Sequence, residues 1–111
     1  MTSDLLDEYV EAVLSLVEQI PPGRVTTYGA LADVVGGGPR QVGSVMAHHG
    51  GPVPWWRVIR ADGSLPPSHD ARARAHYDDE RTPTLPSGKV DVRSAFWSPW
   101  DGQPRAATAE S

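Results

Sequence analysis

The sequence predicts a mainly α domain with a small β-hairpin, of the winged helix-turn-helix class. Two short helical segments flank Gly36-Gly37-Gly38, and the hairpin signal Asp62-Gly63 follows them. A longer amphipathic segment precedes them. At 111 residues the chain is long enough for one domain with a modest core. We expect that domain to span residues 1–100, and the small, polar residues 101–111 to form a flexible tail.

The first helix is predicted over residues 4–20. Apolar side chains recur there at helical spacing, and acidic side chains occupy the opposite face. The apolar positions are Leu5, Leu6, Tyr9, Val10, Val13, Leu14, Val17 and Ile20. Pro21-Pro22-Gly23 is expected to end this helix.

Two shorter helices are predicted next, over residues 28–35 and from Pro39 to about residue 48. Thr26 or Thr27 can cap the first of them, and proline suits the first position of the second. The side chains expected to face inward are Leu31, Val34, Val35, Val42, Val45 and Met46. Gly43 lowers the helix propensity of its segment, so we expect another backbone to approach it closely.

The remaining elements are less regular. Residues 56–60 are predicted as a strand, residues 61–64 as a tight turn, and Leu65 as the start of a return strand. A further helix should begin at Ser68 or Asp70 and run to about Glu80. Residues 82–88 have the composition of a loop, and residues 89–96 of a strand or an extended packing segment.

Charge is distributed unevenly along the chain, which has a net charge of −4. Residues 1–20 carry five acids and no base, whereas residues 21–76 carry six arginines against three aspartates. Such asymmetry is compatible with an anionic partner at one face, although ordinary surface scatter explains it equally well.

Several classes of site are disfavoured by composition. The chain contains no cysteine, which excludes a disulfide, a thiolate nucleophile and a zinc-thiolate centre. His48 and His49 have no third ligand near them in sequence, so we expect no metal and no cofactor. No apolar run is long enough to span a membrane, and the N-terminus is acidic, so we expect a cytoplasmic protein.

The segment from Pro54 to Ile59 is built like a nucleophile loop. A proline sets the turn, a functional position follows, and an arginine leads into a short apolar strand. The functional positions hold Trp55 and Trp56, whose indoles can neither attack nor transfer a proton. This pattern favours a site that binds and does not react.

The second helix of the predicted helix-turn-helix is unusual for reading bases. Its exposed positions are Arg40, Gln41, Ser44, Ala47 and His48. Small side chains allow a helix to lie close to a groove wall, but they lack the paired donors that specify a base sequence. The composition therefore favours recognition of shape or of a lesion over recognition of an operator.

Three ordered motifs resemble the DNA-binding domain of the O6-alkylguanine-DNA alkyltransferases. They are Ile20–Ala32, Arg40–Met46, and Pro52–Ile59 followed by Asp62-Gly63. The last resembles the active-site loop of that family, with Trp55 in the position of the nucleophilic cysteine and Trp56 in that of the adjacent histidine. Because a tryptophan commonly replaces the cysteine in the alkyltransferase-like branch, the chain resembles an alkyltransferase-like protein over roughly residues 9–65.

The resemblance implies roles for individual residues. Tyr28 would press on the DNA backbone and rotate a phosphate, and Arg40 would enter the minor groove in place of the extruded base. Thr27, Gln41, Gly43 and Ser44 would complete the DNA-binding surface. Trp55, Trp56, Val58 and an arginine after the loop, Arg72 or Arg74, would line the lesion pocket, and Arg72 is our choice.

The function implied by the resemblance is a non-enzymatic sensor of DNA damage. It would bind double-stranded DNA containing O6-alkylguanine by minor-groove docking and base flipping, as a monomer, and mark the lesion for nucleotide excision repair proteins. Extruding a base costs a few kcal/mol, least at a damaged pair, and stacking on an aromatic side chain returns about 1–3 kcal/mol.

Other interpretations exist for the same residues. Taken singly, Tyr28 could be a packing residue, Arg40 a solvated arginine and the two tryptophans plain core. The alternative function is a winged-helix transcriptional regulator that binds undamaged DNA. A hydrolase using Ser44 or Ser64 with His48 is disfavoured, because no nucleophile-elbow or triad pattern surrounds either serine.

Overall fold

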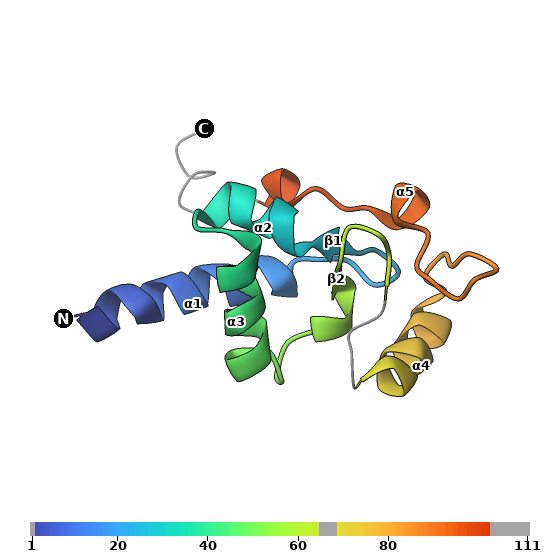
Figure 1. Ribbon diagram of the computed structural model, residues 1–111, viewed down its shortest axis with the longest axis horizontal. Coiled ribbons are helices and arrows are strands. Elements are labelled where there is room, and N and C mark those ends of the chain that lie inside the picture. The colour runs from blue at the N-terminus through green and yellow to red at the C-terminus, as the bar shows by residue number, and fades with distance from the viewer. Residues whose placement is uncertain (1, 65–68, 103–111) are drawn as a thin grey trace.

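The computed structural model describes residues 2–64 and 69–102, and the side chains from residue 7 onward within those ranges. The elements are α1 (Thr2–Glu18), β1 (Thr26–Thr27), α2 (Tyr28–Val35), α3 (Pro39–His49), the 3-10 helix η1 (Trp55–Arg57), β2 (Val58–Ile59), α4 (Asp70–Glu80), α5 (Val92–Ala95) and the 3-10 helix η2 (Pro99–Gly102). The fold is mainly helical, as predicted, and contains a small two-stranded sheet (Figure 1). Within the described ranges no helix is long and apolar enough to cross a membrane.

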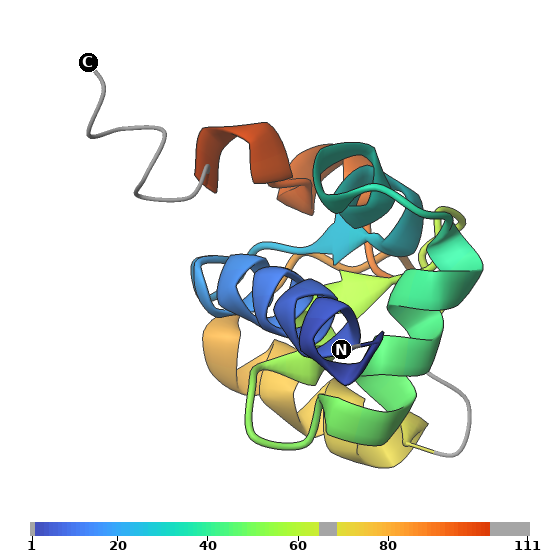
Figure 2. The same ribbon diagram turned by 90° about the vertical axis from the view of Figure 1, so that its left-hand side faces the viewer.

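The first core lies where α1 meets the helix-turn-helix. Val13, Val17 and Ile20 are buried against Leu31 and Val42. Full burial of one such side chain contributes about 1.5–3 kcal/mol. The N-terminal turns of α1 extend beyond α3, so the helix is anchored through its C-terminal half (Figures 1 and 2).

The helix-turn-helix is formed by α2 and α3. The N-cap of α2 is Thr27, whose hydroxyl oxygen accepts a hydrogen bond from the backbone N–H of Ala30 at 3.1 Å. The hydroxyl of Thr26 is instead buried and unpartnered among the described residues. Gly36 and Gly37 connect the two helices with φ angles of +91° and +74°, a conformation that residues with a Cβ rarely adopt.

The predicted hairpin is wrong within the described ranges, because β2 pairs in parallel with β1. The register is Thr26 to Val58 and Thr27 to Ile59. The Asp-Gly turn itself forms, since Gly63 N–H donates to the Arg60 carbonyl at 2.9 Å. The Gly63 carbonyl accepts a hydrogen bond from the Val90 N–H, so the partner of this turn is a segment distant in sequence. Leu65, the expected start of the return strand, lies outside the described residues.

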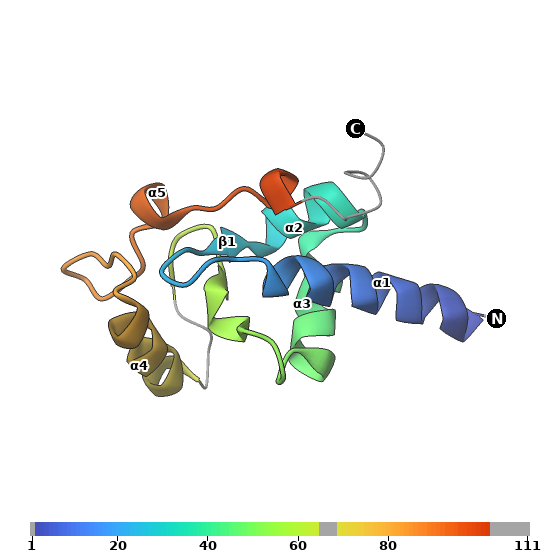
Figure 3. The same ribbon diagram turned by 180° about the vertical axis from the view of Figure 1, so that it is seen from behind.

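Helices α4 and α5 lie at the end of the molecule away from α1, whereas η2 lies beside α2 and Trp97 packs against the first core (Figure 3). The second core contains Val25, Ile59, Ala73, Tyr77 and Val90. The strand expected over residues 89–96 is reduced to isolated bridges, from Thr84 to Val90 and from Val25 to Phe96, and Val92–Ala95 is helical. The backbone N–H groups of Ser94 and Ala95 donate to the Asp91 carbonyl, which forms a helical turn in place of a strand. Of the expected tail, residues 101 and 102 belong to η2, and the rest lies outside the described residues.

Candidate DNA-binding site

Helix α3 presents one buried and one open face. Val42 and Val45 are buried, whereas Arg40, Gln41 and Ser44 are exposed. A Cβ added to Gly43 would meet no atom within 4 Å beyond its own helix and chain neighbours. The expectation that another backbone of this chain approaches Gly43 is therefore wrong. The small side chains of α3 leave this surface open for a molecule outside the chain.

Replacing Gly43 with alanine is expected to stabilise the fold by about 0.5–1 kcal/mol, because alanine has the higher helix propensity and the space is empty. Chemical denaturation of the two proteins would measure this gain. The larger Gly43→Leu should retain the fold but weaken DNA binding if α3 enters a groove. Destabilisation by alanine would contradict the open surface, and unchanged DNA binding by the leucine variant would contradict the docking.

Two of the expected DNA contacts also cap helices. Thr27 caps α2, as described above, and the Gln41 side-chain carbonyl accepts the Gly38 N–H at the start of α3 at 3.0 Å. Each side chain keeps a donor group that the cap does not use, the threonine O–H and the glutamine NH₂.

Tyr28 is the first residue of α2 and lies half-buried at the edge of the first core. Burial raises the pKa of its hydroxyl, and the positive charge of Arg60 acts in the opposite direction. The Tyr28 hydroxyl also acts electrostatically on Tyr77, whose pKa is raised by burial and then by Tyr28. Tyr77 in turn donates to the Trp56 carbonyl at 2.6 Å, which ties α4 to the tryptophan turn.

Trp55 is half-buried at the start of η1, within a group of aromatic and basic side chains. Its ring lies edge-on to that of Trp56, with 5.6 Å between centroids. The imidazoles of His69 and His76 lie 5.6 and 6.0 Å from it. The guanidinium of Arg72 lies 5.5 Å from the same ring, within cation–π range. Trp55 thus offers an apolar surface with donors around it.

The two arginines that follow the loop, Arg72 and Arg74, have different neighbours. Arg72 lies beside Trp55, whereas the Arg74 guanidinium lies near Gly88, where an added Cβ would meet it at 3.1 Å. Two residues along a helix point about 200° apart, so only one of them can face η1.

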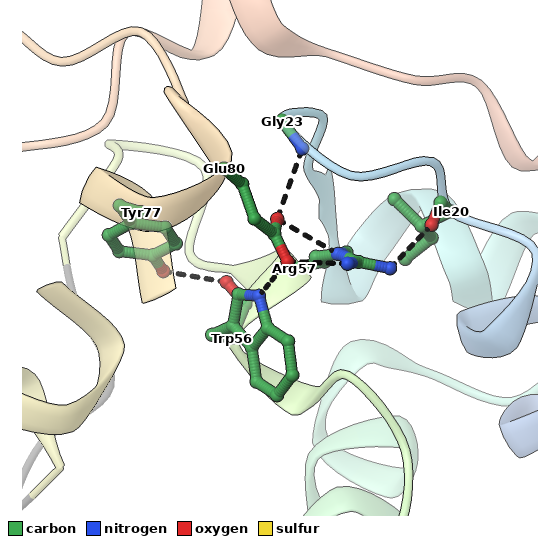
Figure 4. Close-up of polar contacts among 6 residues, drawn as sticks. All are labelled: Ile20, Gly23, Trp56, Arg57, Tyr77 and Glu80. Carbon is green, nitrogen blue, oxygen red and sulfur yellow. Dashed lines mark hydrogen bonds and ion pairs between the residues drawn. The ribbon is translucent and has the colours of Figure 1, made fainter. Parts of the chain in front are cut away.

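Trp56 has a different environment from Trp55, because its polar atom is occupied (Figure 4). Its indole N–H donates to Glu80 at 2.9 Å, and its ring stacks on His76 with 3.6 Å between centroids. It therefore contributes to the fold as a hydrogen-bonded packing residue.

Glu80 is the centre of this polar network. It accepts hydrogen bonds from the Arg57 guanidinium, the Trp56 indole and the Gly23 backbone, and Arg57 also donates to the Ile20 carbonyl at 2.9 Å (Figure 4). Burial alone would raise the pKa of Glu80, but these donors outweigh it and hold the pKa below its usual value. The network ties η1 to α4 and to the turn after α1.

Val58 is fully buried in the first core, so its side chain does not line an open surface. Its backbone N–H donates to the Trp55 carbonyl at the end of η1. Sequence reasoning missed His69, His76 and Glu80 as neighbours of the tryptophans. A signal was present, because His76 and Glu80 are four residues apart and share a helical face.

Among the residues that the structure describes, no group of His, Cys, Asp and Glu is arranged to hold a metal ion. The His48 ring instead contacts the Ser44 carbonyl, with 2.9 Å between its Nδ1 and that oxygen.

Comparison with known proteins gives a consistent result. Residues 8–81 match the family described as 6-O-methylguanine DNA methyltransferase, DNA binding domain. A DNA base-flipping protein of Vibrio parahaemolyticus is 31% identical over 100 residues, which cover 85% of this chain and 100% of that protein. Alkyltransferase-like protein 1 of Schizosaccharomyces pombe is 44% identical over 67 residues, 54% of this chain and 59% of that protein.

The fold is also similar to a solved structure. The crystal structure of S. pombe Atl1 in complex with damaged DNA containing O6-carboxymethylguanine matches with a TM-score of 0.71 and 31% identity, over 83% of this chain and 96% of that one. The chain therefore belongs to the family of the 6-O-methylguanine DNA methyltransferase DNA-binding domain, and within it to the alkyltransferase-like proteins.

Proposed function

We propose that this protein is a non-enzymatic sensor that binds O6-alkylguanine in duplex DNA and flips the damaged nucleotide. The observation that carries the proposal is Trp55, an indole in the position where the resemblance puts the methyltransferase cysteine, with Arg72 and two imidazoles around it. A base stacked against such a ring would be held by contact alone. No thiol exists in the chain to take an alkyl group.

The remaining steps are those that the family resemblance implies for residues of the helix-turn-helix and the tryptophan turn. The open face of α3 docks in the minor groove, and Arg40, exposed in its first turn, occupies the space of the extruded base. Tyr28 rotates the backbone phosphate beside that base. Arg72 interacts with the lesion against Trp55, and Trp56 supports the turn from behind.

Because the complex forms no covalent bond, its role is to mark the lesion for other proteins. We propose that the proteins that recognise this complex are those of nucleotide excision repair. We also propose that the protein acts as a monomer in the cytoplasm and is associated with the nucleoid when bound to DNA. Pull-down of excision-repair proteins on lesion-bearing duplex, with and without this protein, would test the link to nucleotide excision repair.

A titration separates this function from transcriptional regulation. We expect tighter binding to a duplex with one O6-methylguanine than to the same undamaged duplex, in each of several flanking sequences. The protein mass should be unchanged after incubation, because the chain has no cysteine. Trp55→Cys alone should remain inactive, since Trp56 leaves no adjacent histidine to generate the thiolate. A methyl adduct, or affinity for one undamaged sequence regardless of the lesion, would overturn the proposal.

A further inference from the structure

Arg60 is an exposed arginine placed beside Tyr28 by the sheet. The parallel register pairs Thr27 with Ile59, so the next residues along the two strands are Tyr28 and Arg60. The two strands lie side by side at the centre of the molecule (Figure 1). Neighbouring parallel strands are about 4.8 Å apart, which puts the two backbones within side-chain reach of each other.

The electrostatics agree with this placement. The positive charge of Arg60 acts on the Tyr28 hydroxyl strongly enough to offset part of the effect of burial on its pKa. Within the described ranges the ion pairs are Arg57 with Glu80 and Lys89 with Asp62, so Arg60 is in neither. Asp62, the nearest acid along the chain, accepts instead from the Ser64 N–H and hydroxyl, at 3.0 and 2.7 Å.

We propose that Arg60 binds a phosphate flanking the nucleotide that Tyr28 rotates, so that phenol and guanidinium hold one stretch of DNA backbone together. This rests on the proposed function. A neutral phenol supplies a hydrogen bond but no charge, whereas a guanidinium fork neutralises a phosphate and can donate to two of its oxygens. Arg60 would thereby position the backbone, and the base would be read elsewhere.

Methylphosphonate linkages test the contact, because they remove the charge of a single phosphate. The duplex would carry one O6-methylguanine and a methylphosphonate on its 3′ or its 5′ side. Wild type, Arg60→Ala, Arg60→Lys and the control Arg93→Ala, an exposed arginine on α5, would be titrated against each duplex and the unmodified one.

Arg60→Ala should weaken binding to the unmodified lesion duplex about 5- to 10-fold and make the slope of log affinity against log salt shallower by about 0.9. The loss should vanish on one of the two methylphosphonate duplexes. Arg60→Lys should keep the salt slope, and Arg93→Ala should behave as wild type. If Arg60→Ala weakened binding equally on all three duplexes, or did not weaken it on any of them, the proposed role of Arg60 would be overturned. The proposal of lesion sensing would be unaffected. Failure of wild type to prefer the lesion would instead overturn the proposed function.

Discussion

Replacing Glu80 with alanine is expected to lower the free energy of unfolding by about 2–4 kcal/mol. The side chains of Glu80 and Arg57 are only 9% and 13% exposed, so the variant would leave a largely buried guanidinium without its counter-charge. It would also leave the Trp56 indole and the Gly23 N–H without their acceptor. The turn after α1, η1 and α4 would therefore lose the carboxylate that joins them.

Thermal and chemical denaturation measure the effect, and a fall in Tm of more than about 10 °C is expected for a domain of this size. Asp79→Ala, an exposed acid on the same helix, is the matched control and should change stability little. Because the pKa of Glu80 is lowered in the fold, its contribution is present above the unfolded pKa of about 4.3 and is lost as the pH falls through the folded value. The stability difference from Glu80→Gln should therefore shrink in acid. A difference independent of pH would contradict an ionised Glu80.

Arg40→Ala is expected to weaken binding to alkylated duplex by about 1–3 kcal/mol, roughly 5- to 150-fold, with little change in stability. Arg40 is exposed, and among the described contacts it makes no hydrogen bond or ion pair that holds the fold. Its loss would leave the gap made by the extruded base unfilled. Tyr28→Ala should weaken binding by a similar factor, although its half-buried ring also contributes to packing.

Fluorescence titrations in two unrelated flanking sequences would measure these losses, with Arg93→Ala as the charge-matched control. Tyr28→Phe separates the two roles of that residue, since it keeps the ring and removes the hydroxyl. Arg40 would have no part in flipping if its removal changed affinity no more than the Arg93 control does. An effect confined to one flanking sequence would favour the regulator instead.

The helices were largely predictable from the sequence, because their signals are local. Apolar spacing, the Thr27 cap, the glycines at 36 and 37 and Pro39 give the correct bounds of α2 and place α3 to within a residue. The order of the motifs also indicated the family, because motifs consist of residue types at given spacings and can be read from the sequence alone. The absence of cysteine is likewise a property of the sequence alone.

The pairing of β2 and the neighbours of the tryptophans were decided by tertiary structure. A two-residue strand carries no signal for its partner, and the Asp-Gly turn pointed to the adjacent segment instead of β1. The position of Arg72 beside Trp55 depended on which face of α4 packs against η1. Glu80 gained its role from donors 23, 24 and 57 residues away in sequence. Contacts over such separations arise from packing, because burial brings distant polar groups together and requires them to pair.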